Sequence, residues 1–369
     1  MQGKRFIYII GICMSYAFSS FSQEVIPFDT ANWDIKAQGY ILENYKGYDA
    51  IYIQQGRATL KNATFLNGTI EFDVHLSNRQ AFPGIYFRIS GNNGESFYLR
   101  PHLPGKSDGN QAAPITNGLT AWQLYFGDLY SFAYNYHYND WTHVKLLVNN
   151  DKAQIFLDYS KEPQLSWKLK QTPGSGQLAI GGSFAPMHFA NFKYTTDPPE
   201  LINYSVKETP LIDGIIKKWS ISDKFEEDLL NDPDKLNDVI NERTWDKTVE
   251  VEENSAANIS WVRTRYNKNK GNTVFARLTI TSSKEQTKLF TFGYSDRVVV
   301  ILNGKAIYKG DNGYRTRDYR YLGTIGLFDA IYLNLKKGDN ILLFAVSEDF
   351  GGWGIMGKCD NYEGIKVKP

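Results

Sequence analysis

Two carboxylates on one expected strand are the residues whose types and spacing come nearest to a catalytic pair. Glu71 and Asp73 lie in the segment 68–76, where apolar and polar residues alternate strictly, so both side chains belong to one face. Residues i and i+2 of a strand are about 7 Å apart, whereas retaining glycoside hydrolysis needs two carboxyls about 5 Å apart. The next positions hold His75 and Leu76 rather than a third carboxylate. The segment therefore fits a solvated sheet face or an incomplete acid/base set.

Histidine is the other side chain suited to proton transfer near neutral pH. All five histidines lie between residues 75 and 188, so any histidine base must act in that part of the chain. His102 is our candidate, because the expected strand 97–102 places it on one polar face with Tyr98 and Arg100. No two histidines have the spacing of a metal-binding pair, and we expect neither a metal nor a cofactor.

A polar segment in the same part of the chain predicts a ligand site. The stretch 103–121 reads as a long loop rich in Gly, Asn, Pro and Ser, and long loops in compact domains are commonly functional. Arg, Gln and His side chains can grip hydroxyl groups, and aromatic rings can stack on sugars. The alternative is a buried Arg100 paired with Asp73 or Glu71, with Trp122 in the core. The expected ligand-binding residues are Arg88, Tyr98, Arg100, His102, Trp122, Gln123 and Tyr125.

Short alternating segments separated by turn residues predict an all-β fold. We expect two antiparallel β-sandwich (jelly-roll) domains, at 24–196 and 207–369, joined by a Pro-containing linker at 197–206. The second domain has a short helical segment near its start, because Asp232 followed by Pro233 is a typical helix beginning.

The bulk composition limits the partners and the compartment. A net charge of +1 gives no basic field for a nucleic acid, and the aromatic content of 15% suits sandwich cores and sugar stacking. Residues 1–22 resemble a signal peptide, with a short basic start and an apolar stretch too short to span a bilayer. We expect export to the periplasm or the extracellular space, with no transmembrane segment. Only Cys359 remains after cleavage, so no internal disulfide is expected.

The first domain resembles the concanavalin A-like lectin/glucanase fold, including laminin-G-like domains. The segment 65–74, FLNGTIEFDV, carries most of the resemblance, which covers most of 24–196. The resemblance implies a concave sheet that holds a glycan. In laminarinase-type glycosidases of this fold, the first carboxylate of Glu-x-Asp is the nucleophile, which corresponds to Glu71, but the acid/base carboxylate has no counterpart here. A looser similarity to the 3-keto-disaccharide hydrolase-like family assigns no catalytic residue.

The second domain resembles the galactose-binding-like jelly roll. The resemblance rests on 298–310, with its Asn-Gly turn, and on 333–346, with its Leu-x-x-Gly-x-Asn turn. Such modules bind sugar or only pack against a partner domain. The segment 343–354, LFAVSEDFGGWG, raises the question whether its tryptophan stacks on a ligand or closes the core. The expected rim residues are Tyr314, Arg315, Asp318 and Trp353. Such a rim could also hold a structural Ca²⁺, but no spacing demands it.

Three functions remain open from the sequence. The first is an exported, non-catalytic protein that binds an oligo- or polysaccharide on the concave face of the first domain. The second is a glycan-processing hydrolase that uses Glu71, Asp73 and His102. The third is a structural or adhesion module. Fold does not separate these functions, so the site must.

Overall fold

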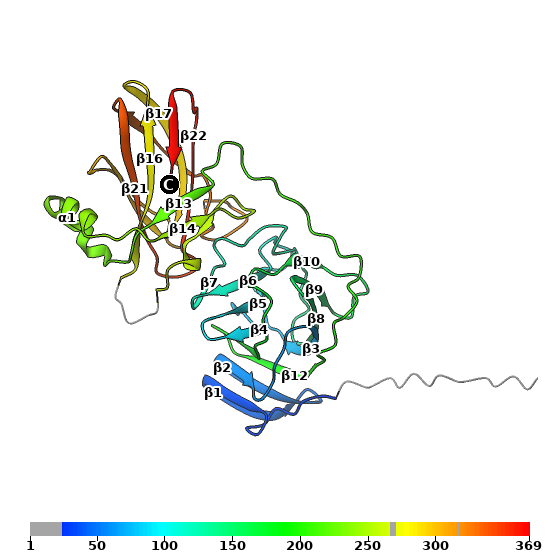
Figure 1. Cartoon of the computed structure of the whole chain (residues 1–369). Helices are drawn as coiled ribbons and strands as arrows, with labels where there is room; N and C mark the ends of the chain where they lie inside the picture. The colour runs from blue at the N-terminus through cyan, green and yellow to red at the C-terminus, as the bar shows by residue number, and fades with distance from the viewer. Residues whose placement is uncertain (1–23, 266–270, 316) are drawn as a thin grey trace, which may run out of the picture.

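A computed structural model describes residues 24–265, 271–315 and 317–369 of the chain. The expected signal peptide at 1–22 lies outside the described residues. The described residues form strands β1 to β23 and one short α-helix, with antiparallel pairing throughout, which confirms the all-β prediction (Figure 1). No helix of the described residues is long and apolar enough to cross a membrane.

The first domain is built from twelve strands in a sheet that curls back on itself. The order is β10-β9-β8-β3-β12-β2-β11-β4-β5-β6-β7, with β1 paired along β2. The strands are β1 (Trp33–Tyr45), β2 (Tyr48–Leu60), β3 (Gly68–His75), β4 (Gly84–Ser90), β5 (Asn93–Leu99), β6 (Asn110–Thr116), β7 (Leu119–Thr120), β8 (Trp141–Asn149), β9 (Lys152–Leu157), β10 (Leu165–Lys168), β11 (Gln177–Gly182) and β12 (Met187–Tyr194).

Strand β2 joins the two layers of this sandwich. Its first half pairs with β12 and its second half pairs with β11, both along the same edge. The change of direction falls at Gln55 and Gly56, which have φ values of 39° and 148°. A Cβ on Gly56 would lie 2.3 Å from the carbonyl oxygen of Lys36, so only glycine fits where β1 crosses this bend.

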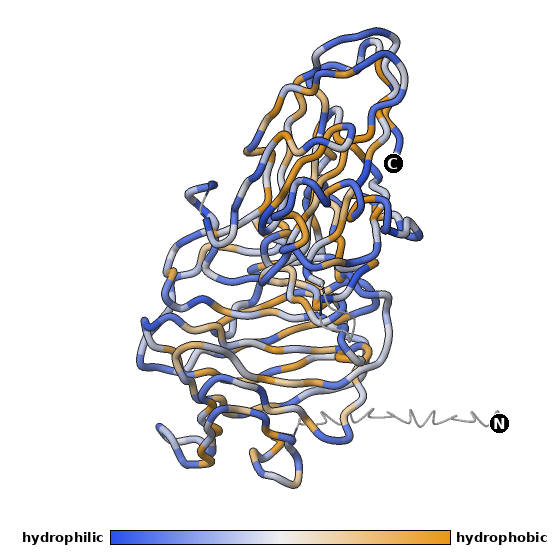
Figure 2. The backbone as a smooth tube through the Cα atoms, turned by 90° about the vertical axis from the view of Figure 1, so that its left-hand side faces the viewer, coloured by the Kyte–Doolittle hydropathy of each residue, from blue (hydrophilic) through white to orange (hydrophobic). Residues whose placement is uncertain are grey.

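The alternation in β3 decides what faces the core. Ile70, Phe72 and Val74 are buried in the first core, where they pack with the apolar residues of β4, β5, β8 and β12. Their neighbours Glu71, Asp73 and His75 therefore point to the other side of the sheet. Figure 2 shows the two domains one above the other, each with apolar segments in its interior.

The stretch 103–121, which was expected to be a loop, contains a strand, so that prediction is wrong. Strand β6 pairs with β5 from Asn110 to Ile115, and all seven of its residues are buried. Because both faces are covered, its sequence NQAAPIT shows no alternation, and its Pro114 reads as a loop residue.

The second domain is a sandwich of two sheets. One has the order β14-β13-β16-β21-β18-β19 with β23 on β16, and the other has the order β15-β22-β17-β20. The strands are β13 (Lys218–Ile221), β14 (Lys247–Glu250), β15 (Ala257–Asn258), β16 (Thr273–Ser282), β17 (Gln286–Ser295), β18 (Arg297–Leu302), β19 (Lys305–Asp311), β20 (Asp329–Leu335), β21 (Gly338–Ser347), β22 (Gly354–Cys359) and β23 (Ile365–Lys368).

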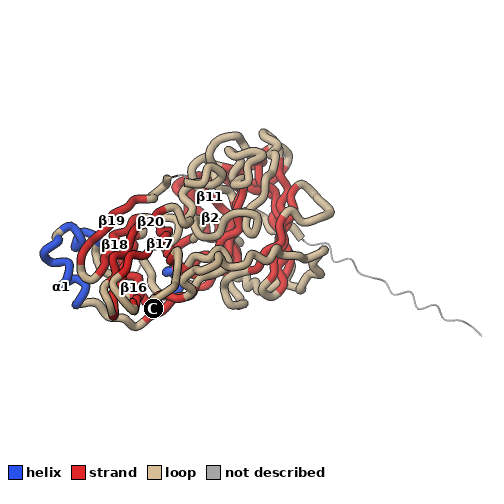
Figure 3. The backbone as a smooth tube through the Cα atoms, turned by 90° about the horizontal axis from the view of Figure 1, so that it is seen from above, coloured by secondary structure: helices blue, strands red, loops and turns tan. Residues whose placement is uncertain are grey.

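The predicted helical segment is present near the start of this domain. It consists of two 3₁₀ helices, Glu227–Asn231 and Pro233–Lys235, followed by α1 (Leu236–Asn241), and a third 3₁₀ helix lies at Ile259–Trp261. Asp232 accepts a hydrogen bond from the backbone of Asp234, as expected for a cap followed by proline. Figure 3 shows α1 at the end of the second domain that is remote from the first.

The segment 195–217 between the domains has neither helix nor strand, and the expected linker falls within it. It runs along the first domain rather than through solvent. Gln154 of β9 exchanges two hydrogen bonds with the backbone of Ile202, and the Tyr204 hydroxyl donates to the carbonyl of Trp167.

The domains dock through Gln123, which is fully buried. Its backbone donates to the Gly351 carbonyl (2.9 Å) and accepts from the Ile325 amide (3.1 Å). Its side-chain amide donates to Asp296 (3.1 Å) and accepts from the Ser295 hydroxyl (2.6 Å). All four polar groups of this first-domain residue are therefore bonded to the second domain, which satisfies them at a buried site.

The glycines of 343–354 make room for this contact. A Cβ on Gly351 would lie 2.6 Å from Gln123 Oε1 and 2.7 Å from the Trp122 ring, and one on Gly352 would lie 2.6 Å from Leu124. Both glycines have positive φ, 115° and 136°. They are needed because the first domain packs directly onto their Cα atoms.

We predict that Gly351→Ala destabilises the protein more than Gly338→Ala. Both residues have positive φ, but nothing lies within 4 Å of a Cβ on Gly338. The shared backbone strain therefore cancels, and the remaining difference, about 2 kcal/mol or more, reports the clash with the first domain. Chemical denaturation of both variants measures it. Equal losses would mean that the contact at Gln123 does not hold the domains together.

Candidate functional site

The outer face of β3 and its two neighbours carries a cluster of charged side chains. We call it the β3 face: Glu71, Asp73 and His75 of β3, His143 and Lys145 of β8, and Lys193 of β12. The register places Lys145 and Lys193 directly opposite Glu71 on either side, and His143 directly opposite Asp73. Cross-strand neighbours have Cβ atoms about 5 Å apart, so these charges interact.

His143 lies between the two carboxylates. Its Nδ1 is 2.7 Å from Asp73 Oδ1, and its Nε2 is 3.3 Å from Glu71 Oε2. Asn191 donates to the other oxygen of Asp73 (2.6 Å), and Lys193 lies 3.3 Å from Glu71. Both carboxylates therefore have a cationic or hydrogen-bonding partner, as largely buried charges require.

The pKa values follow from this arrangement. Burial lowers the pKa of His143, but the hydrogen bonds and charges of Asp73 and Glu71 outweigh burial and raise it to about 9. The hydrogen bond from His143 outweighs the effect of burial on Glu71 and, with the charges of Lys193 and Lys145, lowers the pKa of Glu71 to about 2. At neutral pH the imidazolium and the Glu71 carboxylate are thus both charged.

This protonation state leaves neither Glu71 nor His143 free to give a proton to a ligand. Glu71 is ionised, and both N–H groups of His143 face carboxylates. A general acid must reach the leaving group with its proton. The ionised Glu71 therefore does not fit the general-acid role that glycoside hydrolysis requires.

Tyr159 covers the imidazole of His143. The two rings are parallel within 5° with centroids 4.0 Å apart, yet Tyr159 is 76% exposed. One face of the phenol therefore stacks on His143, and the other lies in water. Asp158 fixes the turn by accepting from the His143 amide (3.0 Å) and from the Tyr134 hydroxyl.

The turn that presents Tyr159 is strained. Asp158 and Tyr159 have φ values of 50° and 59°, in the left-handed region that non-glycine residues seldom occupy. Each such residue costs on the order of 1 kcal/mol, and such strain is concentrated at functional sites. The contacts of Asp158 and the stacked ring offset this cost and hold the outer face of Tyr159 in place.

An aromatic cluster continues the β3 face towards the tip of the β1–β2 hairpin. Tyr45 stacks on His188 (3.7 Å) and meets His75 and Trp141 edge-on, and Tyr48 also contacts Trp141. His75 Nε2 and Trp141 Nε1 are buried without a hydrogen-bond partner among the described residues. Orphaned buried polar atoms are uncommon, and a bound hydroxyl group is one explanation.

Tyr98 and Arg100 come together as the sequence suggested, but in the interior. Arg100 is 6% exposed and bonds Asp108, Gln111 and the Tyr98 hydroxyl. Gln111 in turn donates to the Trp122 carbonyl (2.7 Å). The partner of Arg100 is thus Asp108, not Asp73 or Glu71, and the network holds the segment that docks the domains.

Two of the other expected ligand-binding residues, Arg88 and His102, are not hydrogen-bonded to this network and do not lie on the β3 face. Arg88 is buried, where it bonds the carbonyls of Leu66 (2.7 Å) and Asn150 (2.6 Å). His102 is half-buried against the Phe82 ring, and burial lowers its pKa. It is not part of the charged cluster of Glu71 and Asp73.

Trp122, Gln123 and Tyr125 belong to the contact between the domains. The Tyr125 hydroxyl bonds the Glu252 carboxylate (2.9 Å) and accepts from Asn258 (3.1 Å), both in the second domain. Gln123 and Tyr125 are buried, and only Trp122 is half-exposed. The structure therefore brings these three residues to the second domain rather than to an open cleft.

In the second domain Trp353 is fully buried, and its indole donates to the Val346 carbonyl (3.0 Å). It closes the core rather than offering a platform. Of the other rim residues, Tyr314 is 54% exposed and stacks on Phe350, Arg315 is exposed, and Asp318 pairs with Arg320 (2.7 Å).

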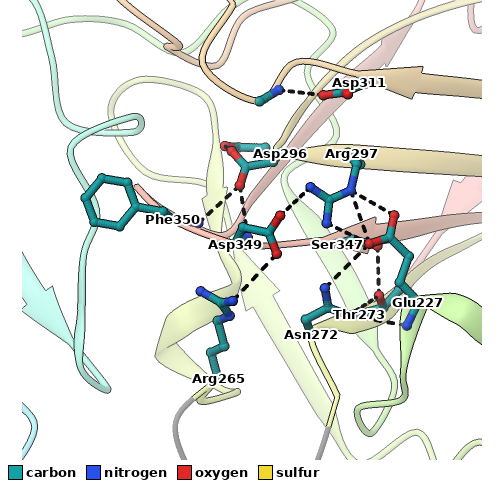
Figure 4. A network of polar contacts seen from close by, with 12 residues as sticks. Glu227, Arg265, Asn272, Thr273, Asp296, Arg297, Asp311, Ser347, Asp349 and Phe350 are labelled. Carbon is teal, nitrogen blue, oxygen red and sulfur yellow. Dashed lines mark hydrogen bonds and ion pairs between the residues drawn. The ribbon is translucent and has the colours of Figure 1, made fainter.

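Behind this rim the charges are paired with one another. Figure 4 shows Asp349 between Arg265 and Arg297, Arg297 on Glu227, and Asp296 accepting from the Phe350 amide. In the parts of the chain that the structure describes, no group of three or more His, Cys, Asp or Glu side chains is placed to hold a metal ion.

Comparisons with known proteins find only remote similarity to this chain. No protein-family model and no curated protein matches the sequence. Among solved structures, a carbohydrate-binding module from Bacillus subtilis (CBM66) is 16% identical, covers 44% of this chain and 94% of its own, and has a TM-score of 0.35. A Bacillus licheniformis β-glucanase is 11% identical, covers 47% of this chain and 96% of its own, and has a TM-score of 0.35. A Mycobacterium fortuitum glycosyl hydrolase family protein is 10% identical, covers 46% of this chain and 94% of its own, and has a TM-score of 0.31. Similarity at this level carries no argument about function.

The sequence analysis missed His143 and Tyr159 as site residues. A signal for His143 was present, because His143 and Lys145 alternate with the apolar Val144 and Leu146. The pairing of this strand with β3 cannot be read from the chain. Nothing local marks Tyr159, whose role depends on a left-handed turn that its sequence does not favour.

We predict that the free energy of unfolding falls as the pH rises from about 6.5 to 9. The pKa of His143 is raised on folding, so its contribution is complete below its unfolded value of 6.5 and is lost through about 9. The loss is on the order of 3 kcal/mol. The Glu71 contribution behaves oppositely, since it is complete above 4.5 and lost as the pH falls towards about 2.

Urea denaturation at pH 6.5 and 9.5 measures this effect. His143→Gln should be less stable at pH 6.5 and should lack the decline above it. A decline of equal size in His143→Gln would assign the effect to other groups and contradict the account of the cluster.

Proposed function

We propose that this protein binds a carbohydrate on the β3 face and does not hydrolyse it. The observation that carries the proposal is the phenol of Tyr159, held parallel to His143 with its outer face in water. A pyranose ring has an apolar C–H face that packs on such a surface, and tyrosine is a frequent anchor of binding sites.

The groups around Tyr159 suit sugar hydroxyls. Glu71 accepts hydrogen bonds, and Lys145 and Lys193 donate them, from positions that are half-buried and therefore held in place. The aromatic cluster around Tyr45 lies next along the same face, with two ring nitrogens that no described residue satisfies. A ligand longer than one sugar unit would cover both parts.

Binding without hydrolysis is favoured by the protonation of the cluster. Glu71 keeps its charge down to a pH of about 2, and the N–H groups of His143 are committed to Asp73 and Glu71. The hydrolase alternative requires one of these groups to release a proton to the substrate. The pKa shifts of both work against that step.

Export is part of the proposal. It is supported by the sequence of residues 1–22, and an oligo- or polysaccharide outside the cytoplasm is then the natural ligand.

We predict that Tyr159→Ala weakens glycan binding by about tenfold or more without unfolding the protein. The reason is the loss of the stacking surface, which is worth about 1.5 kcal/mol. Affinity electrophoresis in gels that contain neutral and acidic polysaccharides measures it. Tyr332→Ala is the matched control, because Tyr332 is 71% exposed in the second domain.

The same mixtures are assayed for newly formed reducing ends. Retention that depends on Tyr159 with no sugar release is the expected result. Release that is lost in Glu71→Gln would establish the hydrolase instead. Retention unchanged in Tyr159→Ala would move the site elsewhere, and no retention on any polysaccharide would favour the structural or adhesion module.

A further inference from the structure

The charges on the β3 face do not balance. Three cationic groups surround Glu71: His143 at 3.3 Å, Lys193 at 3.3 Å, and Lys145 directly across the strand pair. Asp73 adds one negative charge. His143 neutralises this charge, and Asn191 donates a hydrogen bond to the other carboxylate oxygen. With His143 protonated, these three positive charges face two carboxylates, and the nearby Asp158 is already bonded to the His143 amide and the Tyr134 hydroxyl.

Lys145 is the cation of the β3 face that has no bonded partner among the described residues. It is close enough to help lower the pKa of Glu71, but it makes no hydrogen bond or ion pair with any residue that the structure describes. Glu71 is instead satisfied by His143 and Lys193. A half-buried lysine in a row of paired charges has lost part of its hydration without gaining a partner.

Lys145 lies close to Tyr159 on the same face of the sheet. Tyr159 stacks on His143, and His143 and Lys145 are two residues apart on β8, so their side chains share one face about 7 Å apart. A sugar on Tyr159 would therefore have Lys145 and Lys193 at its edge. An anionic substituent on that sugar would meet the unpaired ammonium group.

We propose that the β3 face recognises an acidic glycan, whose carboxylate or sulfate ester is bound by Lys145 with Lys193. This inference rests on the proposed function and adds the charge of its ligand. Lys145 is a specificity-determining residue in this account, and Tyr159 supplies the stacking that is common to acidic and neutral sugars.

The test compares acidic polysaccharides with neutral partners that have the same backbone. The probes are polygalacturonate and its carboxyl-reduced form, alginate and its carboxyl-reduced form, and dextran sulfate and dextran. The carboxylate and sulfate pairs separate the two sources of charge. The full chain is measured by affinity electrophoresis at a fixed salt concentration, as wild type and as Lys145→Gln, Lys145→Arg, Tyr159→Ala and Lys366→Gln/Lys368→Gln.

The double variant is the matched control for general electrostatic attraction. Lys366 and Lys368 line a groove of about 550 Å³ on the second domain, together with Lys217 and Lys218, so their loss removes positive charge at another place. We expect Lys145→Gln to weaken binding to one acidic member about tenfold and to its neutral partner less than twofold. Lys145→Arg should retain the affinity for the acidic polysaccharide. The double variant should have an affinity within twofold of that of the wild type.

Each other result has one meaning. Acidic and neutral partners bound equally, with loss only in Tyr159→Ala, would overturn this inference and leave the proposed function standing. A preference for acidic members that falls in the double variant but not in Lys145→Gln would place the anion site in the second-domain groove and also overturn it. No retention on any member would overturn both proposals.

Discussion

The imidazolium of His143 allows β3 to carry two largely buried carboxylates on its outer face. Glu71 and Asp73 have side chains that are 16% and 6% exposed, and an unpaired carboxylate at such sites would be costly. The cation between them removes that cost, and its own ring then supports Tyr159. Stability and the proposed binding function thus depend on one group, since the residue that neutralises Glu71 and Asp73 also stacks on the exposed Tyr159 ring.

A second constraint organises the rest of the molecule. All four polar groups of Gln123 form hydrogen bonds with the second domain. Gly351 and Gly352, which have positive φ, allow the second domain to approach this residue closely. Arg100, Asp108 and Gln111 stabilise the docking segment from behind. Polar residues that resemble a ligand site in the sequence, such as Gln123, therefore make contacts between the domains. A buried contact between domains needs the same hydrogen-bond donors and acceptors as a bound sugar.

The fold could be predicted from local patterns, and the site only in part. Alternation in 68–76 indicates the sheet face of Glu71 and Asp73, and Asp232 with Pro233 indicates the helical segment. His143 becomes their partner through strand pairing across 70 residues, which no local pattern reports. The strand at 110–116 has no alternation because both of its faces are buried, and the role of Trp353 depends on the place of its indole inside the core, which no local pattern reports.

The most direct test of the central claim is the protonation of His143 at neutral pH while a glycan is bound. Long-range ¹H–¹⁵N NMR of the imidazole groups, assigned with His143→Gln, reports both ring nitrogens. The account predicts that both remain protonated, that the Tyr159 ring signals shift on addition of the polysaccharide, and that no new reducing ends form. An unprotonated nitrogen on His143 together with sugar release would contradict it, because the β3 face would then hold a working base.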